Sequence, residues 1–232
     1  RAHQELVGRD VAIKVLQDHL SPDAAQLFLA ETRTAAQIDH RNIVRVLHAD
    51  MTRSGRMFVA MELLSGQTLQ QLLDDEGALS RVRTVAIASQ LLAALATAHA
   101  GGVIHADVKP SNLFLQDGDP ERVVLLDFGL SRLRAATAVS SLGGTPAYMA
   151  PEQLRDGRVD ASTDLYAAGL VLVAMLTGRR PESQSALVAA VDAIDDAAIR
   201  AAVRRALADD PAERFESAGE MAAALTGDRT VA

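Results

Sequence analysis

The stretch that decides the fold is VIHADVKPSNLFL, residues 103–115. Between apolar flanks it places an acid, a base and an amide within six residues, at Asp107, Lys109 and Asn112. Charged groups in an apolar neighbourhood are costly unless they are paired with other polar groups. We therefore expect this segment to carry a functional site.

The same stretch holds residue types that are scarce elsewhere in the chain. Of its 23 basic residues only Lys14 and Lys109 are lysines, and its only asparagines are Asn42 and Asn112. An ammonium is compact and rotatable, whereas a guanidinium is planar, so the two are not interchangeable. The retained lysines therefore indicate positions where arginine fits badly, although chance in an arginine-rich composition remains an alternative.

Length and composition narrow the class of protein. A chain of 232 residues, 49% of them hydrophobic, can form one globular domain or two lobes of about 80 and 150 residues. A net charge of -7 argues against nucleic acid or an anionic membrane as the main partner. The absence of cysteine excludes disulfides and thiolate metal sites and is typical of a reducing compartment. We therefore expect a cytoplasmic protein.

The longest apolar run, residues 165–176, is shorter than the roughly 20 residues that span a bilayer. It predicts a buried core helix. We expect no membrane contact within this chain, and any membrane tether would lie outside the given residues.

The first strand and the first helix are expected near the amino end. Alternation over residues 10–16 predicts a strand with Ala12 and Lys14 on one face. Residues 21–23, Ser-Pro-Asp, combine an N-cap, a first-turn proline and an acid, so a helix should begin there. Glu31 falls on the apolar stripe of that helix and needs a cation, for which Lys14 is the nearest candidate. Alternatively, Glu31 lies at the edge of the stripe and reaches solvent.

The remaining pattern predicts an α+β protein with a small β-rich amino-terminal lobe, residues 1–64, and a larger, mainly helical lobe, residues 65–232. We expect a hairpin of strands within residues 42–49 and 56–64, and short strands within 113–115 and 122–127. Helices are expected at 68–73, 81–100, 162–177, 183–207 and 217–225, and a period-free loop at 130–149.

A second candidate site residue, Asp127, follows the apolar run VVLL and precedes Phe-Gly. Asp127 and Asn112 offer oxygen ligands, which suit Mg²⁺ better than zinc. Asp107 is a candidate base, and Lys109 could neutralise charge that develops beside it. Together with Lys14, this set favours phosphoryl transfer over acyl transfer or redox chemistry.

Five motifs in register resemble the signature set of the protein kinases. They are VAIK ending at Lys14, Glu31, HADVKPSN at 105–112, DFG at 127–129 and APE at 150–152. The likeness covers almost the whole chain. Lysine two residues after Asp107, with GTPAYMAPE at 144–152, resembles the serine/threonine branch, and the alanine- and arginine-rich composition resembles its bacterial members.

This resemblance implies a two-lobed kinase fold, the cofactors ATP and Mg²⁺, and a protein substrate with a serine or threonine hydroxyl. Lys14 would hold the α and β phosphates and pair with Glu31. Asp127 and Asn112 would bind Mg²⁺. Asp107 would accept the proton of the substrate hydroxyl, and Lys109 would steady the γ-phosphoryl group.

The resemblance also implies an adenine site. Met61 would lie at its back, and the backbone from Glu62 to Leu64 would form the hinge that reads adenine. Ala12 and Phe114 would sandwich the base.

Other matched residues have structural roles by the same resemblance. His105 would fasten the catalytic loop to the Asp-Phe-Gly segment, and Asp164 would hold that loop through backbone amides. Arg214 in DPAERF, residues 210–215, would pair with Glu152. The other histidines show no metal-ligand spacing and are expected to be structural or on the surface: His3, His19, His40, His48 and His99.

The sequence departs from the family at the glycine-rich loop, G-x-G-x-x-G-x-V, which should precede Lys14. Only RAHQELVGRD, residues 1–10, lies upstream. We therefore expect an amino-terminally truncated kinase domain. If the chain is natural as given, phosphate positioning and catalysis should be badly impaired; if the truncation is an artefact, the parent protein should be an active kinase. The alternative is a truncated or pseudokinase-like module that binds protein partners with little catalysis.

A second departure is Ala106, where most relatives have an arginine that grips a phosphate on the activation loop. A phosphate on Thr137, Ser140 or Ser141 then lacks this arginine as a partner. We therefore expect regulation to depend less on phosphorylation of this loop. Thr145 is expected to pack and to position the substrate rather than to be phosphorylated.

Overall fold

The computed structural model describes residues 2–4, 8–16, 21–117, 122–127, 146–181 and 183–227. Some expectations lie outside these residues. They concern Phe128 and Gly129 of the Asp-Phe-Gly triplet, residues 130–145 of the expected loop, and the hydroxyl residues Thr137, Ser140, Ser141 and Thr145.

The amino-terminal part contains a four-stranded antiparallel sheet with the strand order β1-β2-β4-β3. Its strands are β1 (Ala2–Gln4), β2 (Arg9–Val15), β3 (Val46–Met51) and β4 (Met57–Glu62). The predicted strand that carries Lys14 and the predicted hairpin are both confirmed. Lys14 therefore lies on a central strand, opposite Val59.

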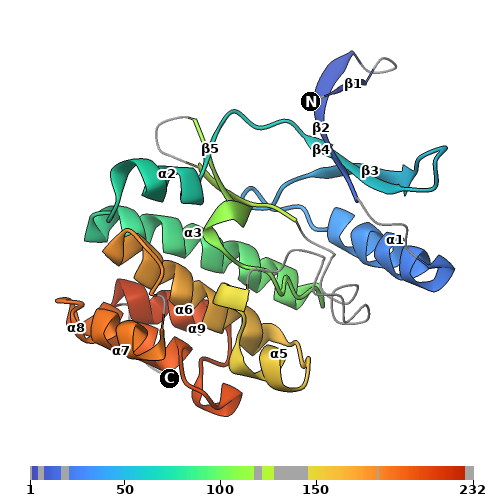
Figure 1. Ribbon diagram of the computed structural model, residues 1–232. Helices are drawn as coiled ribbons and strands as arrows, with labels where there is room; N and C mark the ends of the chain where they lie inside the picture. Colours follow the sequence, from blue (N-terminus) through green and yellow to red (C-terminus); the bar gives the residue numbers. More distant parts are fainter. Residues whose placement is uncertain are drawn as a thin grey trace.

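The helix α1 (Pro22–Ala36) lies beside this sheet (Figure 1). Ser21 caps it as predicted, because the Ser21 hydroxyl accepts the Ala24 N–H at 3.3 Å. Its buried residues are Phe28, Thr32 and Ala35, and Phe28 packs in a small apolar cluster with Leu16 and Met57. The helix therefore carries Glu31 next to its buried face.

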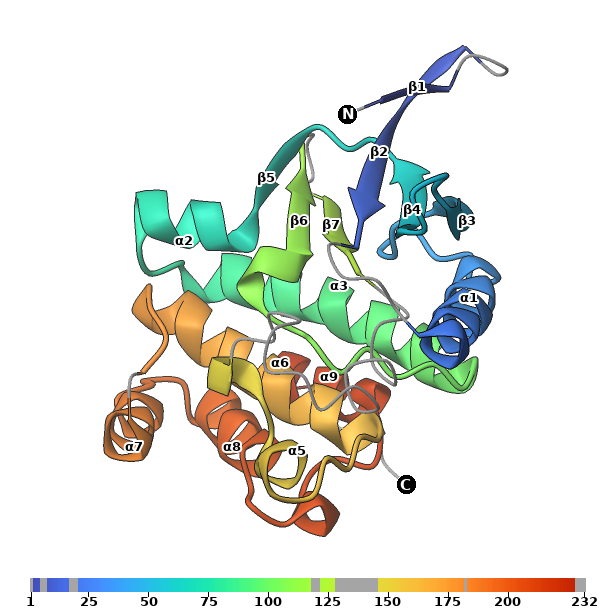
Figure 2. The same cartoon turned by 45° about the vertical axis from the view of Figure 1, so that its right-hand side comes forward.

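A second antiparallel sheet, with the order β5-β6-β7, lies between the first sheet and the helices (Figure 2). Its strands are β5 (Gly66–Thr68), β6 (Leu113–Gln116) and β7 (Arg122–Leu125). Gly66 has a φ of 134°, and a Cβ there would lie 2.1 Å from the Leu115 carbonyl oxygen. Only glycine fits where the chain passes from the first sheet to β5.

Helices and short 3₁₀ turns make up most of the remaining described residues. The helices are α2 (Leu69–Glu76), α3 (Arg81–Ala100), α5 (Pro151–Arg155), α6 (Ala161–Thr177), α7 (Gln184–Asp192), α8 (Ala197–Ala206) and α9 (Ala218–Thr226). The 3₁₀ turns are η1 (Pro110–Asn112), η2 (Pro146–Tyr148) and η3 (Pro211–Glu213).

The helix α6 lies at the centre of this part of the molecule. Every residue from 163 to 175 is buried, which confirms the predicted core helix. By length and composition alone, the helix α3 could span a membrane, and no other described helix could. Its buried residues Leu91, Leu92 and Leu95 belong to the main hydrophobic core, as in the core helix of a globular domain.

The structure differs from the sequence expectation at residues 183–207. One helix was expected, but α7 ends at Asp192 and α8 begins at Ala197. The Asp196 carboxylate accepts the N–H groups of Ala198 and Ile199, both at 2.9 Å. An aspartate that binds its own following backbone starts a new helix rather than continuing the old one.

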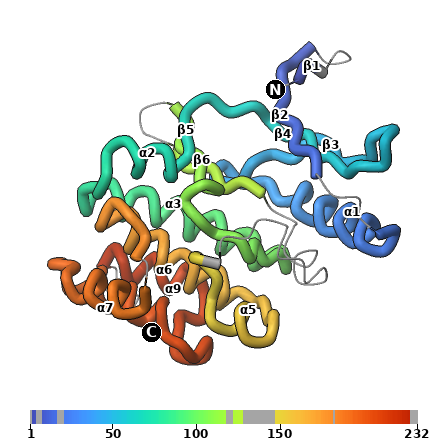
Figure 3. The backbone as a smooth tube through the Cα atoms, in the orientation of Figure 1, coloured from blue at the N-terminus to red at the C-terminus, as the bar shows by residue number. Residues whose placement is uncertain are grey.

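The chain thus forms an α+β protein with a small antiparallel sheet part and a larger helical part, as expected. The tube in Figure 3 runs from blue in the sheet part to red in the helical part. The lobe boundary between residues 64 and 65 stays a prediction.

Candidate active site

The loop between α3 and β6, residues 101–112, is anchored from two sides. Asp164, in the first turn of α6, accepts the N–H of His105 at 2.9 Å and the N–H of Ala106 at 2.7 Å. The His105 ring contacts the Leu126 carbonyl oxygen at 2.6 Å. Both predicted anchoring roles are therefore confirmed.

The two ring nitrogens of His105 have different roles. The Asp107 N–H donates to His105 Nδ1 at 3.2 Å, so that nitrogen must carry a lone pair. The other nitrogen, Nε2, then holds the proton and donates it to Leu126. One neutral ring thereby ties the residue before Asp127 to the backbone of Asp107.

Asp107, Lys109 and Asn112 converge at the end of this loop. Lys109 Nζ lies 2.9 Å from Asp107 Oδ2, and both side chains are mostly buried. Asn112 Nδ2 donates to the same oxygen at 2.8 Å and to the Asp107 carbonyl at 2.8 Å. Two donors on one carboxylate oxygen fix the rotation of the Asp107 side chain.

Two residues beside this cluster have a left-handed backbone. Among the described residues that are not glycine, only Ala106 (φ 59°) and Asp127 (φ 65°) have positive φ angles. Aspartate tolerates this region better than most residues, but alanine does not. Such conformations persist only where the surroundings impose them, and they are common at functional sites.

Asp127 lies next to the cluster because of backbone contacts. The Leu126 N–H donates to the Asn112 carbonyl at 2.8 Å, so the chain leaving β7 passes beside η1. Asp127 Oδ2 is 2.6 Å from Lys14 Nζ on β2. The structure thus brings together the Lys14, Asn112 and Asp127 of the predicted site.

The ion pair of Lys14 differs from the expectation. Within the described ranges Lys14 pairs with Asp127, not with Glu31. Glu31 does point inward, since its Oε2 is a buried atom. Glu31 was chosen as the partner of Lys14 because it is close in sequence, whereas the fold brings Asp127 next to Lys14 on β2.

The predicted adenine-site residues lie on two different sheets. Ala12 on β2 is the cross-strand partner of Met61 on β4, and Phe114 is the middle partner in β6 between Thr68 and Val124. A small hollow of about 20 Å³ beside Met61 is lined by Lys14, Leu16, Phe28, Val44, Val46, Val59, Met61 and Asp127. The sequence did not predict Leu16, Phe28, Val44, Val46 or Val59 there.

The last residue of β4 and the residues that follow it differ in their hydrogen bonding. The Glu62 N–H donates to the Arg45 carbonyl at 3.1 Å, and the Glu62 side chain accepts the Arg45 N–H at 2.9 Å. Glu62 is therefore fixed to the segment before β3. The Leu64 backbone makes no hydrogen bond within the described part of the chain. These contacts suit a rigid strand end followed by a backbone segment that can bind a ligand.

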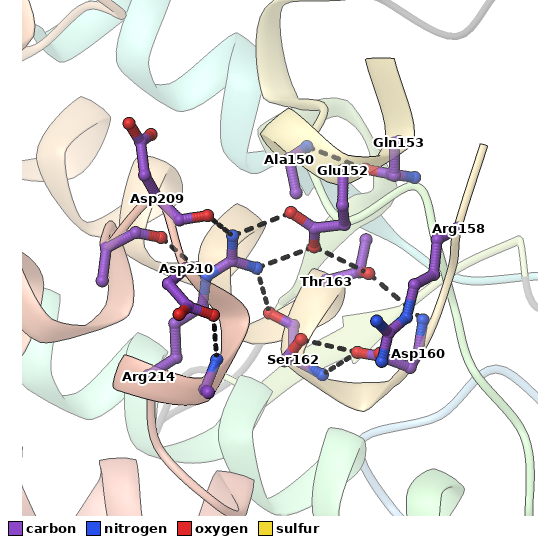
Figure 4. Close-up of polar contacts among 12 residues, drawn as sticks. Ala150, Glu152, Gln153, Arg158, Asp160, Ser162, Thr163, Asp209, Asp210 and Arg214 are labelled. Carbon is purple, nitrogen blue, oxygen red and sulfur yellow. Dashed lines mark hydrogen bonds and ion pairs between the residues drawn. The ribbon is translucent and has the colours of Figure 1, made fainter. Parts of the chain in front are cut away.

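A buried ion pair lies behind the loop, where α5 meets η3 (Figure 4). Arg214 NH1 and NH2 lie 2.7 and 2.8 Å from the two carboxylate oxygens of Glu152, which confirms the predicted pair. Arg214 also donates to carbonyl oxygens of Ala208 and Ser162, and the Thr163 hydroxyl donates to Glu152. Burial by itself would raise the pKa of Glu152, but the hydrogen bonds from Arg214 and Thr163 lower it overall.

Comparison with known proteins decides which family this geometry represents. Residues 1–224 match the family described as the protein kinase domain. The chain belongs to the protein kinase family.

Bacterial relatives of this kinase domain are named as serine/threonine-protein kinases. Pkn3 of Myxococcus xanthus is 36% identical over 97% of this chain and 46% of its own length. PknL of Mycobacterium tuberculosis is 38% identical over 94% of this chain and 59% of its own length. The chain therefore spans about half the length of these curated relatives.

Solved structures show the same fold. The crystal structure of a double mutant of the Mycobacterium tuberculosis PknI kinase domain matches with a TM-score of 0.74 and 30% identity. The match covers 94% of this chain and 84% of that one. The predicted kinase-like fold is thereby confirmed.

Two side chains of this kinase domain make contacts that the sequence interpretation did not name. His99, expected to be structural or on the surface, has a structural role, because its Nε2 lies 2.8 Å from Asp164 Oδ2. Gln153 bonds Ala150 and the Ala106 carbonyl. The His99 bond and the bond from Gln153 to Ala106 each join residues more than 40 positions apart, and the bond from Ala150 to Gln153 is a local helix cap. None of the three leaves a periodic signal in the sequence.

Proposed function

We propose that this domain transfers the γ-phosphate of ATP to a serine or threonine hydroxyl of a protein. The observation that carries the proposal is the convergence of Asp107, Lys109 and Asn112 on one loop, beside the Lys14 and Asp127 pair. A carboxylate base, two ammonium groups and an amide suit a reaction that depends on positioning and charge.

The residues fit Mg²⁺. Within the described part of the chain, both side-chain hydrogen bonds of Asn112 are donated by Nδ2, so Oδ1 is the atom that would face a cation. Asp127 adds a carboxylate, and Mg²⁺ at a phosphate site commonly has only one or two protein carboxylates. No cluster of three acidic, histidine or cysteine ligands exists among the described residues, which agrees with that sparse set. Asp127 and Asn112 would hold the ion, which neutralises phosphate charge when bound.

Asp107, Lys109 and Lys14 each have a separate role in the transfer. Asp107, oriented by Lys109 and Asn112, accepts the proton of the substrate hydroxyl as that oxygen attacks the γ-phosphorus. The bond from this phosphorus to the β–γ bridging oxygen breaks, and ADP leaves. The Lys109 ammonium offsets the negative charge that develops on the γ-phosphoryl group. Lys14 holds the α and β phosphates, for which it must exchange its contact with Asp127.

Adenine would lie between Ala12 and Phe114, with Met61 at the back. The backbone between Glu62 and Leu64 would form its hydrogen bonds. Because Glu62 is held to Arg45, the hinge can present these groups without reordering. We further propose a cytoplasmic location, where ATP and protein substrates are at hand.

The test is transfer of labelled phosphate from γ-labelled ATP to a generic basic protein, with and without Mg²⁺. The chain should be assayed, and so should any longer protein that contains it, followed by identification of the labelled residues. We expect Mg²⁺-dependent label on serine and threonine, lost in Asp127→Asn. Tight ATP binding without transfer in either form would instead support a pseudokinase-like module.

A further inference from the structure

We infer that Gln153 is a positioning residue that holds the catalytic aspartate in place through the backbone of Ala106. The inference rests on the proposed function and deepens it. It starts from the peptide unit that joins Ala106 to Asp107, the candidate base.

This peptide unit is bonded at both ends. Its carbonyl oxygen, on Ala106, accepts from Gln153 Nε2 at 3.3 Å. Its N–H, on Asp107, donates to His105 Nδ1 at 3.2 Å. Rotation of this unit would swing the Asp107 side chain, so the two bonds together set its direction.

Ala106 needs such support because of its conformation. Its φ of 59° is unfavourable for alanine. Asp164 holds the Ala106 N–H at 2.7 Å, but that bond leaves the following carbonyl free to turn. Among the described side chains Gln153 supplies the bond to that carbonyl.

The orientation of the Gln153 amide is determined by a second contact. Gln153 Oε1 accepts the Ala150 N–H at 2.8 Å at the start of α5 (Figure 4). Because a backbone N–H can only donate, the amide oxygen must face Ala150, and the NH₂ group must face Ala106. The neighbouring Glu152 is fixed by Arg214, so Gln153 extends from a rigid support.

The chain contains a matched control. Gln71 occupies the same capping position in α2, where its Oε1 accepts the Thr68 N–H at 2.8 Å. Among the described residues, its side-chain hydrogen bonds go to Thr68 and not to residues 101–112. The same substitution at residue 71 or at residue 153 therefore changes a similar helix cap. Only the substitution at residue 153 also changes a bond to the catalytic loop.

The experiment compares Gln153→Glu with Gln71→Glu. Glutamate keeps the oxygen that accepts the cap N–H, but it replaces the donor to Ala106 with an acceptor. We expect Gln153→Glu to lower kcat about tenfold, with KM for ATP within about twofold and little change in Tm. Gln153→Met, which carries no charge, should also lower kcat, whereas Gln71→Glu and Gln71→Met should not.

A second measurement, amide hydrogen exchange, does not depend on catalytic activity. Amide hydrogen exchange of residues 104–108 should be faster in both Gln153 variants than in the wild type and the Gln71 variants. Unchanged kcat and unchanged exchange in both Gln153 variants would overturn the inference and leave the proposed function intact. If the wild type transfers no phosphate, the proposed function fails, and the exchange rates alone decide whether Gln153 holds the loop.

Discussion

Two ion pairs of this kinase domain join distant parts of the chain, but their surroundings differ. Arg214 and Glu152 form a two-pronged pair whose side chains are 0% and 7% exposed. Lys14 and Asp127 form a single contact of 2.6 Å, and their side chains are 40% and 18% exposed. The first pair lies within the helical part, whereas the second joins β2 to the residues after β7.

The number of additional bonds separates the two pairs further. Arg214 also donates to three backbone carbonyls, and its guanidinium lies over the Tyr166 ring at 4.8 Å. Lys14 Nζ has only Asp127 as its partner within the described ranges. A saturated, buried pair stabilises one structure, while a single, partly open contact can be exchanged for a ligand. We therefore expect the first pair to determine stability and the second to determine activity.

The largest effect should follow from breaking the buried pair. Arg214→Met leaves the Glu152 carboxylate buried without its cation, which should lower the free energy of unfolding by about 3–5 kcal/mol. Urea denaturation measures this loss. The double substitution Arg214→Met with Glu152→Met should recover part of it, and a single variant as stable as the wild type would contradict a structural role.

Removing the other pair should affect activity instead. Lys14→Met removes a donor to the transferring nucleotide, and we expect a loss of about 10²-fold or more in kcat/KM. The free energy of unfolding should change by only about 1 kcal/mol, because the pair is partly solvated. Steady-state transfer assays and urea denaturation on the same preparations check both statements.

The matched control for Lys14 is Arg204→Met. Arg204 and Asp192 also form a 2.6 Å pair, but this pair lies on α7 and α8, away from the site. Its loss should leave transfer unchanged. Equal activity in Lys14→Met and Arg204→Met would remove the distinction between the two regions.

Acid should weaken the buried pair. Because the pKa of Glu152 is lower in the folded protein than its ordinary value of 4.5, the carboxylate contributes stability above that value. The contribution is lost as the pH falls through the lower, folded pKa. We expect the stability difference between the wild type and Glu152→Gln to shrink as the pH is lowered from above 4.5 to below it. Urea midpoints measured across this range test it, and a pH-independent difference would speak against a charged pair.

The smallest effect concerns Ala106. Glycine adopts positive φ without the steric cost that alanine has, so Ala106→Gly should raise the free energy of unfolding by about 0.5–1 kcal/mol. Thermal unfolding measures the change. A destabilised variant would mean that the Ala106 methyl group contributes packing that outweighs its strain.

The sequence was informative where a motif and its structure are local. Ser21 and Pro22 predicted the start of α1, and the apolar run at 165–176 predicted the buried α6. The loop from His105 to Asn112 was predicted by resemblance, and its anchors on Leu126 and Asp164 are present. These features depend on residue type and near spacing, both of which can be read from one sequence.

The sequence was not informative about which distant groups meet. His99 contacts Asp164 across 65 positions, and Lys14 contacts Asp127 across 113. Such pairs depend on how strands and helices pack, and no periodicity records them. The break before Asp196 was missed for another reason, since alanine-rich sequence on both sides favours helix and one capping aspartate decides the outcome.

The most direct test of the account is phosphate transfer by Asp107→Asn beside the wild type, with the unfolding midpoint of each protein measured in parallel. Asparagine keeps the shape of the side chain but cannot serve as a base. We predict Mg²⁺-dependent transfer to serine or threonine by the wild type, a loss of about 10²- to 10⁴-fold in the variant, and similar unfolding midpoints. Equal transfer by both proteins would contradict the central claim that Asp107 is the base of a kinase active site.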